Sequence, residues 1–264
     1  MLTIREYKKA ASLEEAWTLN QKRTSRIIGG MLWLKMTKGN VMTAIDLSGL
    51  GLDTIEETDT EFRIGCMASL RAMELHRGLD AYSGGAVREA LRHIVGVQFR
   101  NLATAGGSVY GRFGFSDVIS VLMAMDTYVE MYKGGLIPLA EFVQMPYDRD
   151  ILVRVIIRKE KASFCYQSVR IARTDFPVLT CAAALTEAGL RLAFGARPGK
   201  AVLLQDCAAL HGPLTAGLAE EIGKLAAEQI YTEGNNRGSA QYRSHLVKVL
   251  AERAVLKLGG ISAC

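Results

Sequence analysis

The chain has 264 residues, of which 49% are hydrophobic, so it can bury a substantial core and exceeds the usual size of one compact domain. Its longest apolar runs are interrupted by polar residues well short of the ~20 needed to cross a bilayer, and its start lacks the pattern of a secretory signal. The formal charge of +5 is modest and the basic residues are scattered, which argues against nucleic-acid binding. These features predict a cytoplasmic protein of about two or three subdomains that uses neither a membrane nor a nucleic acid as partner.

The cysteines and histidines show no pattern that is typical of a metal site. The five cysteines are Cys66, Cys165, Cys181, Cys207 and Cys264, and no two of them form a C-x-x-C pair. The four histidines also lack close metal-ligand spacing. We therefore expect reduced, mostly buried thiols and no metal in this chain.

The first third of the chain predicts a helix and several short strands. Ser12-Leu13-Glu14-Glu15 has the form of a capping box, which predicts a helix over about 13–22. A short buried strand at 26–28 leads into Gly29-Gly30. Alternation of apolar and polar residues predicts further strands at 43–47 and 61–64.

The remaining elements are predicted from caps and periodicity. Ser69 caps a helix that reaches His76, and Ser116 caps one that runs to Met125. Gly84-Gly85 precedes residues 86–94, in which apolar side chains recur at helical spacing, and this glycine pair is interpreted as a turn. Strands are predicted at 128–131, 151–157 and 163–172, and two helices with apolar faces follow, around 214–225 and 246–250. The polar, turn-rich stretch 144–150 suggests a domain boundary.

Two glycine pairs have the character of anion-binding loops. Gly29-Gly30 follows a strand, and Gly106-Gly107 lies within the run Arg100 to Ser108. Glycine lets backbone amides approach an anion with no side chain in between, and two such segments can hold one pyrophosphate. Neither matches G-x-G-x-x-G, and the chain lacks strict βαβ alternation, so a Rossmann sheet is not expected.

These segments and their order resemble the FAD-binding (medium) subunit of the molybdenum hydroxylases, the family that includes xanthine dehydrogenase and carbon monoxide dehydrogenase. The matching stretches are Ile28-Gly29-Gly30-Met31-Leu32-Trp33, Ile64 to Met67, Arg100 to Ser108, Ser116-Asp117, Ile151 to Val153, Thr174-Asp175-Phe176-Pro177 and Arg237 to Arg243. The likeness runs from the first predicted strand to the last predicted helix.

The resemblance implies an α+β architecture in two parts. Residues 1–150 would form a two-subdomain FAD-binding fold of the vanillyl-alcohol-oxidase (PCMH) type, with subdomains at about 1–52 and 53–150. Residues 151–264 would form a smaller α/β C-terminal domain of the molybdenum hydroxylase flavoprotein type.

The resemblance also implies the residues that hold FAD. The pyrophosphate would lie between the two glycine segments, Asp117 would accept hydrogen bonds from the hydroxyls of the flavin's sugar-like chain, and Leu152 and Asp175 would lie near the ring. The implied cofactor-binding residues are Ile28, Gly29, Gly30, Met31, Leu32, Thr104, Ala105, Gly106, Gly107, Ser108, Asp117, Leu152 and Asp175. Taken by themselves, Thr104 is equally a strand residue and Asp117 equally a helix cap. No catalytic residue is implied in this chain.

The chain departs from the family pattern at several positions. Met31, Leu32 and Trp33 follow the first glycine pair where relatives have a small polar residue, and Ser108 replaces a common Asn or His. Gln167 and Ser168 stand where a Lys is often found. Because backbone amides remain whatever the side chain, these changes bear on cofactor affinity and redox potential more than on fold.

The primary hypothesis is an FAD-binding electron-transfer subunit of a multi-subunit, xanthine dehydrogenase-like oxidoreductase. Its partners would be a small [2Fe–2S] subunit and a large molybdopterin-binding subunit, and NAD is one candidate acceptor. Two alternatives stay open: a flavin-free structural or assembly subunit, suggested by Met31-Leu32-Trp33, and a stand-alone FAD oxidoreductase.

Overall fold

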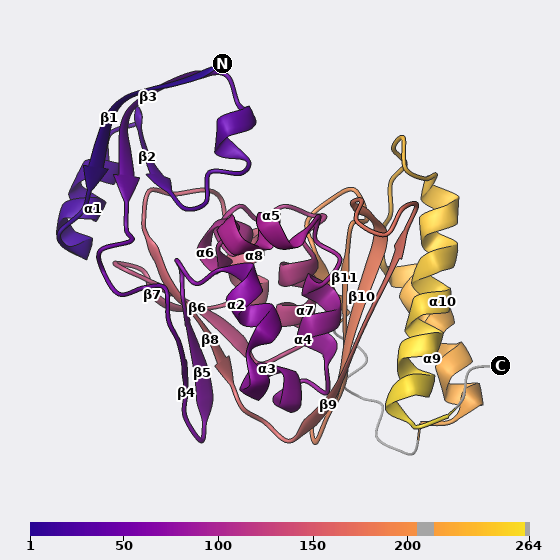
Figure 1. Ribbon diagram of the computed structural model, residues 1–264. Coiled ribbons are helices and arrows are strands. Elements are labelled where there is room, and N and C mark those ends of the chain that lie inside the picture. The colour runs from indigo at the N-terminus through magenta and orange to yellow at the C-terminus, as the bar shows by residue number, and fades with distance from the viewer. Residues whose placement is uncertain (205–213, 262–264) are drawn as a thin grey trace.

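A computed structural model describes residues 1–204 and 214–261, in which three sheets and the helices between them follow one another along the chain (Figure 1). The predictions for Cys207 and Cys264 concern residues outside the described ranges. Among the described helices, none combines the length and the apolar run that a bilayer crossing needs.

The first sheet is small and parallel. Its strands are β1 (Leu2–Lys9), β2 (Ser25–Ile28) and β3 (Gly39–Asp46), in the order β1-β3-β2. Helix α1 (Leu13–Asn20) connects β1 to β2, and the 3-10 helix η1 (Leu34–Met36) precedes β3. Ser12 caps α1 as predicted, because its side chain accepts a hydrogen bond from the Glu15 amide at 3.1 Å. This sheet delivers Ile28 and the first glycine pair to the centre of the molecule.

The second sheet is antiparallel and packs against short helices. Its strands are β4 (Ile55–Glu57), β5 (Glu61–Gly65), β6 (Thr127–Met131), β7 (Gly135–Pro138) and β8 (Leu152–Arg158), in the order β4-β5-β8-β6-β7. The helices are α2 (Leu70–Leu75), α3 (Arg77–Tyr82), α4 (Ala86–Leu91), α5 (Val97–Leu102), α6 (Ala105–Tyr110), α7 (Asp117–Met123) and α8 (Leu139–Gln144).

The pairing of β8 bears on the domain boundary. We expected the boundary near residue 150, which would assign β8 to the C-terminal domain. In the sheet, β8 pairs with β5 and β6, both of which precede that boundary. The division of the chain therefore stays a prediction, and the pairing favours placing it after β8.

The third sheet is antiparallel and buried on both faces. Its strands are β9 (Ala162–Arg170), β10 (Pro177–Thr186), β11 (Gly189–Gly195) and β12 (Val202–Leu204), in the order β12-β11-β10-β9. Helices α9 (Ala216–Gln229) and α10 (Ala240–Leu258) cover one face, and the central helices cover the other (Figure 1).

Strand β10 shows how side chains alternate between the two faces of this sheet. Cys181 and Ala183 pack in the core with α9 and α10, whereas Ala182 and Ala184 pack in the core of the central helices. Small residues on both faces let helices approach from each side. The third sheet therefore packs against helices α4 and α7, and the loop after β9 lies beside these helices.

Candidate functional site

The first glycine segment leaves β2 and crosses directly over the end of α5. A Cβ atom built on Gly30 would lie 1.8 Å from the carbonyl oxygen of Leu102, and one built on Gly29 would lie 2.7 Å from Thr104 Oγ1. Only glycine allows this approach. The two predicted segments, far apart in sequence, therefore lie against each other. Within this segment Met31 has the left-handed backbone conformation, at φ +57°, and neither glycine has it.

The second glycine pair lies in the first turn of helix α6. We expected a loop at Gly106-Gly107, and this expectation was wrong: Thr104 is the N-cap, and its Oγ1 accepts a hydrogen bond from the Gly107 amide at 3.1 Å. A Cβ on Gly106 would lie 2.7 Å from Cys66, so this glycine permits close packing. Glycine's poor helix propensity hid the helix in the sequence, and tertiary packing overrides that propensity.

The two segments differ in which backbone amides are free. The amide of Ala105 donates to the Ala68 carbonyl and that of Gly106 to the Cys66 carbonyl, both at 2.8 Å. The amides of Gly30, Met31 and Leu32 donate to no residue that the structure describes. Donors for an anion therefore come from the first segment, and the second contributes Thr104 and the start of a helix.

The glycine segments separate two cavities of about 440 and 450 Å³. Ile28, Gly29, Thr104 and Gly107 line both. The first cavity, which we call the aromatic cavity, is also lined by Gly30, Met31, Leu32, Ser108, Asp117 and Asp175, and the second is also lined by Gly106 and Leu152. Ala105 lines neither and is fully buried in the core. The structure thus brings together most of the residues implied for the cofactor, and it places Leu152 in a different cavity from Asp117 and Asp175.

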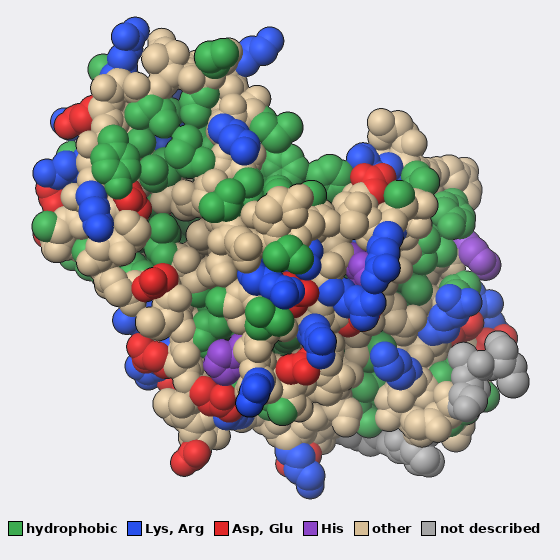
Figure 2. Space-filling model, in the orientation of Figure 1, with side chains coloured by type: hydrophobic (Ala, Val, Ile, Leu, Met, Phe, Trp, Pro, Cys, Tyr) green, Lys and Arg blue, Asp and Glu red, His purple; other side chains and the backbone are tan. Residues whose placement is uncertain are grey.

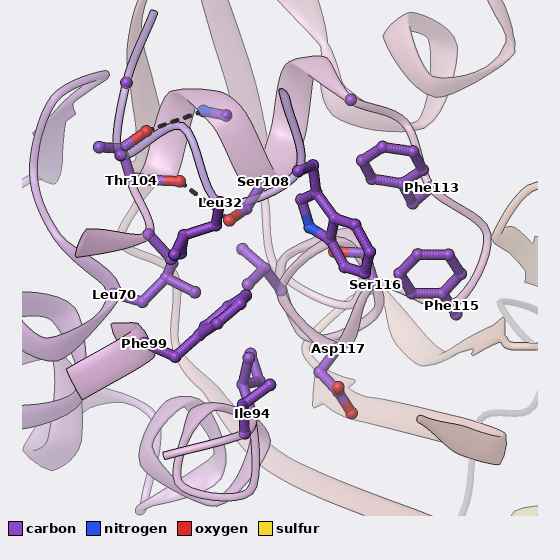
Figure 3. Close-up of a pocket in the computed structure, with 18 of the residues that line it drawn as sticks. Leu32, Leu70, Ile94, Phe99, Thr104, Ser108, Phe113, Phe115, Ser116 and Asp117 are labelled. Carbon is purple, nitrogen blue, oxygen red and sulfur yellow. Dashed lines mark hydrogen bonds between the residues drawn. The ribbon is translucent and has the colours of Figure 1, made fainter. Parts of the chain in front are cut away.

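The aromatic cavity has apolar walls with several aromatic rings. Figure 3 shows Leu70, Ile94 and Phe99 on one side and Phe113 and Phe115 on the other. Trp33 stacks on Phe176 at a centroid distance of 5.7 Å, and Phe115 meets Phe176 edge-on at 4.6 Å. Sequence reasoning did not select Phe113 or Phe115; the one available signal was their spacing, F-G-F, immediately before the Ser116 cap.

Asp117 is buried in the wall of the aromatic cavity, in the first turn of α7 (Figure 3). Its Oδ1 accepts hydrogen bonds from the Tyr166 hydroxyl and from Arg170, so Oδ2 is the oxygen left for a ligand hydroxyl. Burial raises the pKa of Asp117 to about 6, although the Arg170 guanidinium acts in the opposite direction. The carboxylate is therefore ionised above about pH 6 and can accept hydrogen bonds there.

Arg170 joins the Asp117 carboxylate to the main chain of Asp175, and it was not predicted from the sequence. Its side chain is 7% exposed, it pairs with Asp117, and it donates to the main-chain carbonyl of Asp175 at 2.5 Å. The Asp175 carboxylate accepts from the Phe176 amide at 2.7 Å and lies 3.4 Å from Arg237. An arginine at the end of β9 gave no local signal, because its partner Asp117 lies 53 residues earlier.

Comparison with known proteins decides the family. Residues 3–159 match the FAD binding domain in molybdopterin dehydrogenase, and residues 164–258 match the CO dehydrogenase flavoprotein C-terminal domain. The chain belongs to this family of FAD-binding domains. The cofactor that the family indicates is FAD, as the sequence predicted. The free amides at Gly30–Leu32, the close glycine approach and the ring-lined cavity fit such a cofactor.

Full-length relatives and structures agree with this assignment. The chain is 27% identical to the uncharacterized protein YgfM of Escherichia coli, over 94% of this chain and 93% of that protein. It is 26% identical to the nicotine 6-hydroxylase medium subunit of Paenarthrobacter nicotinovorans, over 96% of each. One chain of the carbon monoxide dehydrogenase from Hydrogenophaga pseudoflava has the same fold, with a TM-score of 0.88, 19% identity and 98% coverage of both chains. The predicted family and the α+β fold are therefore confirmed.

Proposed function

We propose that the FAD-binding family member described here is the medium, electron-transfer subunit of a multi-subunit molybdenum hydroxylase. It would receive electrons from [2Fe–2S] clusters on a partner chain and deliver them to NAD or another acceptor. A molybdopterin-binding partner would hydroxylate the substrate, which we place among purines, aldehydes, carbon monoxide and similar small molecules. The observation that carries this proposal is the meeting of two cavities at the glycine segments.

A dinucleotide has the shape that this arrangement accommodates. Its pyrophosphate lies between two ring systems, and here the free amides of Gly30–Leu32 line one cavity directly after Ile28 and Gly29, which line both. Main-chain amides can stabilise a pyrophosphate without a lysine. We therefore place the phosphates at Gly29–Leu32 and Thr104–Ser108, with one ring in each cavity.

We place the flavin end in the aromatic cavity. Its aromatic walls can enclose a flat ring system and exclude water from it. Asp117 Oδ2 is placed to accept hydrogen bonds from the hydroxyls of the sugar-like chain, and Arg170 provides a positive charge in the same wall. Bound FAD supplies one- and two-electron redox chemistry, and the residues of this chain position it and tune its potential. Leu152 would then contact the other end of the cofactor.

One alternative function is supported by a specific observation. Arg170 and Tyr166 already donate hydrogen bonds to Asp117 Oδ1, and Trp33 stacks on Phe176 within the aromatic cavity. A flavin-free assembly subunit would retain this arrangement. A stand-alone FAD oxidoreductase has no such support.

The deciding experiment is to purify the chain from its native host with its partners and to denature it. We expect one FAD per chain to be released, together with co-purifying iron–sulfur and molybdopterin-binding chains. No flavin after reconstitution with excess FAD would favour the assembly subunit. Rapid reduction of the isolated flavoprotein by a small organic substrate, with no iron or molybdenum present, would favour the stand-alone oxidoreductase.

A further inference from the structure

A basic groove lies beside the aromatic cavity, between the residues that follow α4, strand β9 and helix α10. It encloses about 470 Å³, and its wall carries Arg173, Arg253 and Lys257. His93 and Arg170 line both this groove and the aromatic cavity, so the two spaces adjoin. Figure 2 shows Lys and Arg side chains gathering on the face between the central helices and α10.

Three cations of this groove are not neutralised by neighbouring carboxylates, whereas Arg170 is paired with Asp117. Arg173, Arg253 and Lys257 form no ion pair within the described residues. Glu89 is the acidic residue in the wall, and it is already engaged by Arg92 at 3.1 Å and by His93 at 3.4 Å. Like charges that line one concave surface repel each other and attract an anion.

The positive potential extends to the inner end of the groove. Burial lowers the pKa of His93, and the charges of Arg92, Arg170 and Arg173 lower it further, against the opposing effect of Glu89. A neutral imidazole there can still donate one hydrogen bond. An anion in the groove would therefore meet this donor at the inner end, beside Arg173, Arg253 and Lys257 in the wall.

The size and the walls of the groove limit the class of anion. Its volume falls within the ~300–1,000 Å³ that is usual for pockets that hold small organic ligands. Val169 and Leu250 provide apolar surface next to the cations. This combination suits a molecule that carries both phosphates and a sugar or base, and it suits an inorganic ion or a broad protein surface less well.

We propose that this groove binds the pyrophosphate of a nucleotide, with Arg173, Arg253 and Lys257 contacting the phosphate oxygens and Val169 and Leu250 packing against the ribose or base. Two sources share this chemistry: a nicotinamide dinucleotide that accepts electrons from the adjoining cavity, and a free nucleoside diphosphate that acts as an effector. The binding itself does not require FAD, whereas the role as an acceptor site rests on the proposed function.

Calorimetric titration of the full chain, saturated with FAD so that the cofactor site is filled, tests this proposal. The probes are ADP, ADP-ribose, NADH and adenosine. We expect one site per chain for the three pyrophosphate compounds, none for adenosine, and weaker binding at high ionic strength. Arg253→Gln should weaken binding by about tenfold, and Arg253→Gln with Lys257→Gln by about a hundredfold. Tighter binding of NADH than of ADP identifies the acceptor as the source, and equal binding identifies the effector.

The matched control is Lys161→Gln with Lys224→Gln, which removes the same charge from exposed ion pairs outside the groove. It should bind the probes as the unaltered chain does. The proposal is overturned if no pyrophosphate probe binds at about 1 mM, or if control and groove variants lose affinity equally. It is also overturned if the groove variants bind ADP with unchanged affinity but no longer co-purify with a partner chain. If the chain binds no FAD, the proposed function fails, and the same titrations of the apoprotein still test the groove.

Discussion

The two glycine segments at the centre of the molecule have similar sequences and use their backbones in opposite ways. After β2, the amides of Gly30–Leu32 remain free for a ligand. At the start of α6, the amides of Ala105, Gly106 and Gly107 are all bonded within the chain. A glycine pair therefore marks a close approach of backbone to something else, and only the surrounding structure decides whether that partner is a ligand or the protein itself.

The largest effect is expected at Gly30. In Gly30→Ala the new Cβ would lie 1.8 Å from the Leu102 carbonyl, which forces the first segment away from the second. We expect FAD affinity to fall by about a hundredfold or more, and the free energy of unfolding to fall by about 1–3 kcal/mol. Released flavin per chain and thermal unfolding measure the two effects.

The control for this change is Gly217→Ala. Gly217 lies in the first turn of α9, and its nearest neighbour to a new Cβ is at 4.0 Å. It should leave FAD content unchanged. Normal FAD affinity in Gly30→Ala would show that the two segments do not need to meet.

A smaller effect is expected from the titration of Asp117, which contributes an acceptor where the first glycine segment contributes donors. With a pKa of about 6, its carboxylate is ionised at pH 7.5 and protonated at pH 5. We expect FAD affinity to fall by about tenfold as the pH drops through 6, because a protonated carboxyl is a weaker acceptor for the hydroxyls. Equilibrium titration of apoprotein with FAD across this range measures it. In Asp117→Asn the fall in FAD affinity near pH 6 should disappear. An unchanged fall would assign the titration to another group.

The smallest effect is expected within the second segment, where two adjacent glycines have different roles. A Cβ on Gly107 would meet only Thr104 Oγ1, at 3.1 Å, and would project toward the junction of the cavities. Gly107→Ala should lower FAD affinity a few-fold, by about 1 kcal/mol, with unfolding unchanged or slightly delayed.

Gly106→Ala is expected to affect stability more than Gly107→Ala does. Its Cβ would lie 2.7 Å from Cys66, so the free energy of unfolding should fall by about 1–3 kcal/mol. Denaturant unfolding and FAD titration of both variants separate the packing role from the ligand role. Equal loss of stability in the two variants would contradict the assignment.

Local features were predictable because their causes are local. Ser12, Ser69 and Ser116 each accept a hydrogen bond from the amide three residues later, as the cap patterns predicted. The turn at Gly84-Gly85 was also predicted, and both residues have left-handed backbones, at φ +56° and +85°. The helix at Ala105 was missed because it is held by Ala68 and Cys66, which lie far away in sequence.

The sequence by itself determined the family, the α+β elements and the segments that approach one another, because glycine pairs, caps and apolar periodicity act over a few residues. Only the tertiary structure decided which amides are free, that Arg170 joins Asp117 to the loop of Asp175, and that Leu152 faces a cavity of its own. It also decided that Arg173, Arg253 and Lys257 meet in one groove. These contacts join residues from different sheets, and their energies depend on distances and burial that no stretch of sequence specifies alone.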